Sequence, residues 1–149
     1  MLKNFPDLKI LNIIERENYI SSTGLKALLI GLNSNKKLQE LYLSCYDLRT
    51  VKVMKYFVYS LKFFPDLKVL SIEKSGIAYE QILELCKGFK HGSKLEILLL
   101  YNNKIENKGV IAISKRLPNL INLKRITLKS NSIENINLLI KATKIYIQL

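Results

Sequence analysis

The chain contains no tryptophan and little of several residue types on which enzyme and metal sites depend. Its 149 residues include one histidine, two cysteines, three prolines and six glycines. A structural zinc site uses about four cysteine or histidine ligands, more than His91, Cys45 and Cys86 provide together. We therefore expect no bound metal and no cofactor, and we interpret His91 as a solvated loop residue.

The low cysteine content also excludes a disulfide framework, which in small secreted domains needs several pairs. Cys45 follows a predicted strand, whereas Cys86 lies within a helical apolar pattern. We expect both to be free thiols in a reducing compartment inside the cell, which we take to be the cytoplasm.

Long hydrophobic runs are absent as well. No stretch of about eighteen apolar residues occurs, so no membrane-spanning segment is expected. The N-terminus lacks the apolar stretch and the small-residue cleavage site of a secretory signal. A single histidine, no glycine-rich phosphate loop and no paired cysteine motif leave no catalytic constellation, and the sequence predicts a protein that is not an enzyme.

Acidic residues are few, with 12 against 24 basic ones, and the net charge is +12. Lysine outnumbers arginine by 20 to 4, and asparagine (13) and isoleucine (19) are also abundant. These three residue types share A/T-rich codons, so base composition of the genome accounts for much of the excess. Arginine, the better residue for bidentate contacts to phosphates and bases, is scarce. The charge favours solubility and nonspecific attraction to polyanions, and nucleic acid is not the expected partner.

Five copies of one leucine pattern fill the chain, and they begin 28 to 30 residues apart. The copies are Leu8-Leu11-Ile13, Leu38-Leu41-Leu43, Leu67-Leu70-Ile72, Leu95-Leu98-Leu100 and Leu123-Ile126-Leu128. A fixed period in this range is typical of a solenoid, in which each unit contacts only its neighbours. The sequence therefore predicts a single domain, residues 1–149, of about five repeats starting near Leu8, Leu38, Leu67, Leu95 and Leu123.

Each unit is predicted to contain a strand, a turn and a helix. In the fourth copy, Leu98 and Leu100 alternate with Ile97, Leu99 and Tyr101, which places the two sets on opposite faces of a strand. The turn position after the strand is Asn103 or Asn131 in the last two copies and Arg16, Tyr46 or Ser75 in the others. We expect the asparagines to be buried and to satisfy backbone groups of the turn and of the adjacent unit.

Apolar residues at helical spacing follow the turns, as in Leu25, Leu28, Leu29 and Leu32, where Ser22 or Thr23 is the predicted N-cap. The matching sets are Val51, Met54, Phe57, Val58 and Leu61; Ile82, Leu85, Cys86 and Phe89; and Val110, Ile113 and Leu117. We expect these stripes to pack against the strands. After the fifth copy, 135–140 is predicted as a helix and 144–149 as a short strand.

The chain resembles the leucine-rich repeat family, specifically its ribonuclease-inhibitor-like subclass with long helical units. The motifs that carry the resemblance are Leu95-x-x-Leu98-x-Leu100-x-x-Asn103-x-Ile105-x-x-x-Gly109 and Leu123-x-x-Ile126-x-Leu128-x-x-Asn131-x-Ile133, with Gly24 and Gly109 at the family's helix-opening glycine. The resemblance implies an α/β fold, a leucine-rich repeat solenoid. Its units would form a curved right-handed βα arc with parallel strands on the concave face and helices on the convex face.

The concave face of such an arc is the expected site for a protein partner. Ile97, Leu99 and Tyr101 give it an apolar centre, flanked by the acidic pair Glu40 and Glu73. The predicted partner-binding residues are Tyr42, Val69, Glu73, Ile97, Leu99, Tyr101, Arg125 and Lys129. An apolar, tyrosine-containing centre with a charged rim is typical of protein-binding patches. The competing interpretation is that Ile97 and Leu99 are ordinary exposed strand residues.

Two other functions stay open at this point. The resemblance extends to Ran GTPase-activating proteins, and Arg16 and Arg49 follow strands where they could contact a GTPase. A binder of nucleic acid or anionic surfaces is motivated by the charge alone. No polar capping unit is evident at the N-terminus. We therefore expect one of three arrangements: the chain is a piece of a longer array, it associates with another copy through uncapped ends, or its N-terminal segment folds over its own edge.

Overall fold

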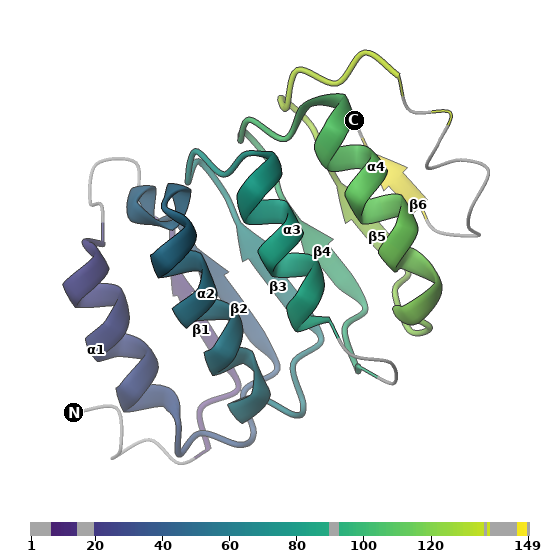
Figure 1. Cartoon of the computed structure of the whole chain (residues 1–149). Helices are drawn as coiled ribbons and strands as arrows, with labels where there is room; N and C mark the ends of the chain where they lie inside the picture. The colour runs from purple at the N-terminus through teal and green to yellow at the C-terminus, as the bar shows by residue number, and fades with distance from the viewer. Residues whose placement is uncertain (1–6, 15–19, 90–92, 136, 138–145, 149) are drawn as a thin grey trace.

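The computed structural model of the protein describes residues 7–14, 20–89, 93–135, 137 and 146–148. It is built on a six-stranded parallel sheet whose strands follow one another in chain order. The four labelled α-helices alternate with the first five strands and lie together along one face of the sheet (Figure 1). Consecutive parallel strands joined by crossovers of one hand place their helices on the same side. The α/β class predicted from the sequence is confirmed at this level.

The elements repeat with the period of the leucine pattern. The strands are β1 (Ile10–Ile13), β2 (Glu40–Leu43), β3 (Val69–Ile72), β4 (Ile97–Leu99), β5 (Arg125–Thr127) and β6 (Tyr146–Gln148). The α-helices are α1 (Ser22–Leu32), α2 (Val51–Ser60), α3 (Tyr79–Gly88) and α4 (Glu106–Arg116). Short 3-10 helices are η2 (Tyr46–Arg49), η3 (Leu61–Phe63) and η4 (Leu117–Asn119).

The leucine frame forms the core between sheet and helices, as its alternation predicts. Leu41, Leu70, Leu98 and Ile126 lie in register on neighbouring strands, and all four are fully buried. Helical residues such as Phe57 pack into the same core and are equally inaccessible. The frame residues of β1 are only partly buried, because β1 has a neighbouring strand on one side alone in the sheet order. Burial of this continuous apolar layer supplies most of the stabilisation of such a fold.

The helix caps differ from the sequence prediction in one place. Helix α1 is capped by Ser21, whose Oγ accepts a hydrogen bond from the Gly24 backbone N–H at 3.2 Å. The prediction of Ser22 or Thr23 was therefore wrong by at least one residue. Ser21 is the last residue with extended backbone angles before the helix, and only a residue in that conformation can direct its hydroxyl to the N3 amide.

The asparagine prediction is confirmed at both positions. The Asn103 amide nitrogen donates to the carbonyl oxygens of Ile72 (2.8 Å), Leu100 (3.0 Å) and Tyr101 (3.2 Å). Its oxygen accepts from the backbone N–H groups of Ser75 (3.0 Å) and Ile77 (3.3 Å). One side chain thus completes its own turn and the turn of the preceding unit.

Asn131 repeats this arrangement one unit later. Its amide nitrogen reaches the carbonyl oxygens of Leu100 and Leu128, each at 2.8 Å, and its oxygen accepts from the N–H of Ile105 at 3.3 Å. Ser75 takes the position with a shorter side chain. Its hydroxyl accepts from the Cys45 N–H and donates to the Glu73 carbonyl, both at 2.9 Å. Adjacent units are therefore joined by buried polar bonds as well as by strand pairing.

Gly109 occupies a point of close contact in α4. A Cβ atom at this position would collide with the side chain of Ile105, and Gly109 is buried. We expect Gly109→Ala to lower the free energy of unfolding by about 1–3 kcal/mol, since overpacking outweighs the better helix propensity of alanine. Chemical denaturation of the variant measures this. Gly24→Ala is the control, because the nearest side-chain atom would lie at 3.3 Å and Gly24 is exposed. Equal effects of the two substitutions would contradict this account.

Several predictions fall on residues that the structure does not describe or describes in part. His91 and Arg16 lie outside the described residues, as does most of the helix predicted over 135–140. The strand predicted over 144–149 is present as β6, which pairs with β5. Arg49 ends the short helix η2 and is exposed. None of the helices in the described ranges combines the length and apolar character that crossing a membrane requires.

Candidate functional site

The predicted site residues lie on the face of the sheet opposite α1–α4, which we call the helix-free face. Strand register arranges its side chains in three rows that run across the strands. The first row is Ile10, Glu40, Val69, Ile97, Arg125 and Tyr146; the second is Asn12, Tyr42, Ser71, Leu99, Thr127 and Gln148. The third, two residues further along each chain segment, is Ile14, Ser44, Glu73, Tyr101 and Lys129. The structure therefore brings all eight predicted partner-binding residues onto one surface.

The centre of the helix-free face is apolar. Val69 pairs in register with Ile97, and Leu99 lies on the same strand as Ile97 two residues away. All three side chains, and that of Tyr101, are half-buried. The Tyr101 hydroxyl has no hydrogen bond to any other described residue, so it is available to a partner. A half-buried ring with an available hydroxyl suits an aromatic anchor.

Small residues between the larger ones contribute little surface. Ser71 is in register between Tyr42 and Leu99, and none of its surface is accessible. Ser44 and Thr127 are also buried. The alternation places these residues correctly on the helix-free face, but a place on this face does not by itself make a side chain accessible. Their larger neighbours close over them, so a partner would contact mainly the larger side chains.

Two carboxylates on the helix-free face are held by hydroxyl groups. The Tyr42 hydroxyl donates to Glu40 Oε2 at 2.7 Å, and Ser71 Oγ donates to Glu73 Oε1 at 2.9 Å. Partial burial, followed by the hydrogen bond to the Glu40 carboxylate, raises the pKa of Tyr42 to about 12. Tyr42 therefore remains a protonated donor at neutral pH and fixes the position of the Glu40 carboxylate.

The basic end of the face includes a strand whose contribution the sequence analysis missed. Arg125 donates to the Gln148 side-chain oxygen at 2.6 Å, and its guanidinium carbon lies 5.9 Å from the centroid of the Tyr146 ring. Tyr146 is 64 % exposed, and Ile147 packs against the core. The alternation of Tyr146, Ile147 and Gln148 was a usable signal, because it matches that of the leucine frames. The site therefore extends one strand further than predicted.

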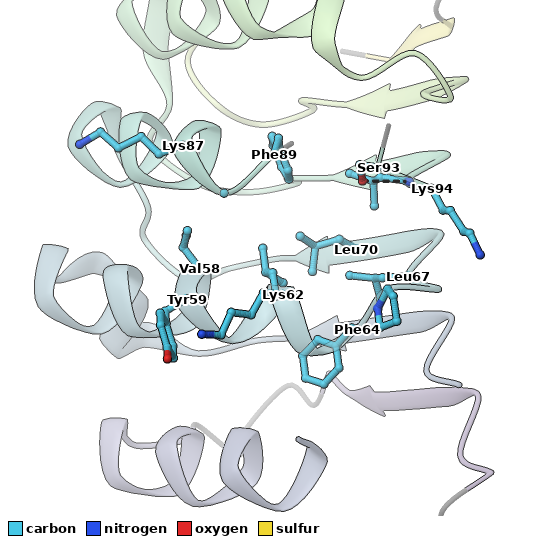
Figure 2. A pocket seen from close by; sticks show the side chains of 14 residues that line it. Val58, Tyr59, Lys62, Phe64, Leu67, Leu70, Lys87, Phe89, Ser93 and Lys94 are labelled. Carbon is cyan, nitrogen blue, oxygen red and sulfur yellow. Dashed lines mark hydrogen bonds between the residues drawn. The ribbon is translucent and has the colours of Figure 1, made fainter. Parts of the chain in front are cut away.

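A groove of about 460 Å³ between η3 and the end of α3 is the other candidate surface (Figure 2). Its apolar walls include Phe64, Leu70 and Phe89, and Lys62, Lys87 and Lys94 line it. Figure 2 shows Lys87 and Lys94 directed away from the apolar walls.

The lysines of this groove already have partners. Lys87 pairs with Glu84 at 2.7 Å, and Lys94 pairs with Asp66 at 2.6 Å. The Lys62 ammonium lies 3.5 Å from the centroid of the Tyr59 ring, a cation–π contact. The groove therefore gives no specific indication of an anionic ligand.

Both cysteines are buried free thiols, and the Cys45 thiol donates to the Ile20 carbonyl at 3.1 Å. Burial raises the pKa of Cys86 to about 11 and also raises that of Cys45, so both thiols stay protonated at neutral pH. Within the described ranges, no three His, Cys, Asp or Glu side chains are grouped as a metal site would require.

The helix-free face thus combines an apolar strip, an aromatic side chain with an available hydroxyl, and charges of both signs at its ends. This combination is typical of protein-binding surfaces, which have an apolar centre and a polar rim. No protein-family model matches the chain, and a search of curated proteins finds no match.

Proposed function

We propose that the chain is a leucine-rich repeat solenoid of the ribonuclease-inhibitor-like subclass and acts as a non-catalytic protein-interaction module. The repeated leucine frame, the sequential parallel strands and the asparagine bonds between units support the repeat assignment. In such a solenoid the helix-free face is the concave face. The partner is a protein that binds across β2–β5.

The observation that carries this proposal is the apolar strip of Val69, Ile97 and Leu99 beside Tyr101. These side chains stand on adjacent strands in register, and no described helix covers them. Apolar side chains grouped at the centre of a polar rim are the usual arrangement of a protein-binding patch.

We expect Tyr101→Ala to weaken partner binding by more than ~1 kcal/mol, because truncating a central aromatic anchor removes buried contact area and a hydrogen bond. The full chain is immobilised, incubated with lysate from its source, and the proteins it retains are identified and their affinities measured. Folding stability should change less than for a core substitution, since Tyr101 is only half-buried.

Tyr59→Ala is the matched control, since Tyr59 is 59 % exposed on α2, on the helical side. Retained proteins that are lost with Tyr101→Ala and Leu99→Asp, but not with Tyr59→Ala, support the concave site. Binding that is unchanged in both Tyr101→Ala and Leu99→Asp would contradict the concave site. Selective retention of a small GTPase would favour the GTPase-activating alternative. Nucleic acid retained at physiological salt would favour the polyanion alternative.

A further inference from the structure

The two acidic residues of the helix-free face are bonded to neutral hydroxyl groups. The exposed Glu80 and Glu134 likewise form no ion pair with a described residue. Four other carboxylates of the described ranges are paired with lysines. These pairs are Asp7–Lys37, Asp66–Lys94, Glu84–Lys87 and Glu96–Lys124. Glu40 and Glu73 instead accept hydrogen bonds from Tyr42 and Ser71, and neither forms an ion pair with a described residue. The chain has twice as many basic as acidic residues, yet neither carboxylate of this face is paired with a described lysine or arginine.

The basic residues at the other end of the face, Arg125 and Lys129, also lack ion pairs with described residues. Arg125 is oriented by the neutral groups of Gln148 and Tyr146. Within the described part of the chain, neither Arg125 nor Lys129 is ion-paired with a carboxylate. The face therefore carries acidic and basic side chains at separate ends, and none of the four is ion-paired with a described residue.

Strand register gives both outer rows the same polarity. The first row runs from Glu40 on β2 through the apolar Val69 and Ile97 to Arg125 on β5. Neighbouring strands lie about 4.8 Å apart, so the backbones of the two charged residues are separated by roughly 14 Å. This separation is too long for them to pair with each other.

The third row repeats the order with Glu73, Tyr101 and Lys129. Two strand intervals separate its charged residues, roughly 10 Å at the backbone. Each outer row thus runs from an acidic residue, Glu40 on β2 or Glu73 after β3, through apolar or aromatic side chains to a basic residue on or after β5.

We propose that the concave face binds a helical protein segment of opposite polarity, with basic residues over Glu40 and Glu73, apolar residues over Ile97 and Leu99, and acidic residues over Arg125. The inference rests on the proposed function. A separation of 10–14 Å corresponds to about 6–9 residues of helix at about 1.5 Å per residue. The helix dipole favours acidic residues at the N-terminus and basic residues at the C-terminus. The segment therefore lies with its N-terminus over β5 and its C-terminus over β2.

The net charge of the chain alone, without these positioned carboxylates, predicts a different ligand preference. A chain of charge +12 attracts acidic peptides, and uniformly acidic ligands would bind best if only overall charge mattered. Basic residues in a selected ligand would then be disfavoured. Selection of basic residues against this overall repulsion is therefore a specific signature of Glu40 and Glu73.

The test is a selection from a phage library displaying random peptides of about 16 residues, which as a helix span roughly 24 Å. The full chain is the target, at physiological salt. Enriched peptides are expected to be acidic at one end, apolar in the middle and basic at the other. One enriched peptide is synthesised with a fluorescent label, and its affinity is measured by anisotropy for the wild type and for variants.

Glu40→Gln with Glu73→Gln, and separately Arg125→Gln with Lys129→Gln, are each expected to weaken this peptide by about tenfold. Glutamine keeps an acceptor for Tyr42 and Ser71, and a thermal melt checks that each variant is folded. Glu80→Gln with Glu134→Gln is the control, because both side chains are exposed and lie off the helix-free face. This control should change the affinity by less than about twofold.

The outcomes separate this inference from the proposed function. Sensitivity to both charge variants supports the polar helix. Uniformly acidic peptides, or peptides weakened by Tyr101→Ala but by neither charge variant, overturn the inference and leave the concave site standing. Peptides unaffected by Tyr101→Ala and by both charge variants overturn the site as well. Absence of any enriched peptide overturns the inference.

Discussion

Replacement of Leu98 by alanine is expected to lower the free energy of unfolding by about 2–5 kcal/mol. Leu98 has no accessible surface and lies in register between Leu70 and Ile126, which are equally buried. The substitution removes apolar contacts and leaves a cavity that the flanking strands cannot close without losing their own pairing. Urea denaturation followed by circular dichroism measures the change.

Leu83→Ala is the matched control for Leu98→Ala. Leu83 is 36 % exposed on α3, so the same chemical truncation there should cost less than about 1 kcal/mol. A loss of stability as large for Leu83 as for Leu98 would mean that the inward and outward sides of the repeat are wrongly assigned. The comparison uses one side-chain type, which removes differences in intrinsic hydrophobicity.

Asn103→Ala is expected to destabilise by about 2–4 kcal/mol, although it removes only a few atoms. The substitution leaves the carbonyl of Ile72 and the amides of Ser75 and Ile77 without the bonds that Asn103 supplies to them. Asn103 is 7 % exposed, so water cannot easily replace them. The loss should be measurable by urea denaturation.

Two further variants test whether the lost hydrogen bonds cause the destabilisation of Asn103→Ala. Asn122→Ala is the control, because the exposed Asn122 side chain donates one hydrogen bond to the described residues, at the Ser93 carbonyl. It should cost less than about 1 kcal/mol. Asn103→Ser should fall between wild type and alanine, since Ser75 serves the equivalent turn with a hydroxyl. Equal destabilisation by serine and alanine would show that cavity formation, not hydrogen bonding, dominates at this position.

The sequence predicts the features of the fold that recur with the repeat. The buried frame around Leu98, the strand positions and the asparagine bonds each depend on a residue that returns at a constant interval, and all are present. The strand at Tyr146–Gln148 is also present as predicted, because period-two alternation continues there without a full leucine frame. Periodicity determines which side of an element a residue occupies.

Features that depend on a particular side-chain conformation were not predictable. The bond from Tyr42 to Glu40 joins residues two apart on one strand, and nothing in the residue types selects that rotamer. The turns after β3, β4 and β5 place Lys74, Asn102 and Ser130 in the left-handed region, with φ of 49°, 55° and 59°. A lysine or serine gives no signal for this conformation, because glycine and asparagine are its usual occupants. The shared position within the repeat is the only evidence for it.

In the candidate site, too, the face of each residue was predictable from the sequence, whereas its burial and its bonding partners were not. Alternation places Ile97, Leu99 and Tyr101 together on one face, whereas the burial of Ser71 depends on the sizes of its cross-strand neighbours Tyr42 and Leu99. Residue types alone also do not show which carboxylates will find a lysine. The separated charges of the face are therefore a result of the three-dimensional arrangement.

The buried side-chain bonds that complete the turns after β2, β3 and β4 come in each case from the following unit. Ser75 completes a turn that begins at Cys45, Asn103 completes the turn containing Ser75, and Asn131 bonds the amide of Ile105. Each turn is thus finished by a residue that is synthesised about one unit later. During translation, the newest unit always has backbone groups that await the next segment, and the growing end stays less stable than the part behind it. The protein is therefore expected to gain its structure in the order in which it leaves the ribosome, with each unit secured only on arrival of its successor.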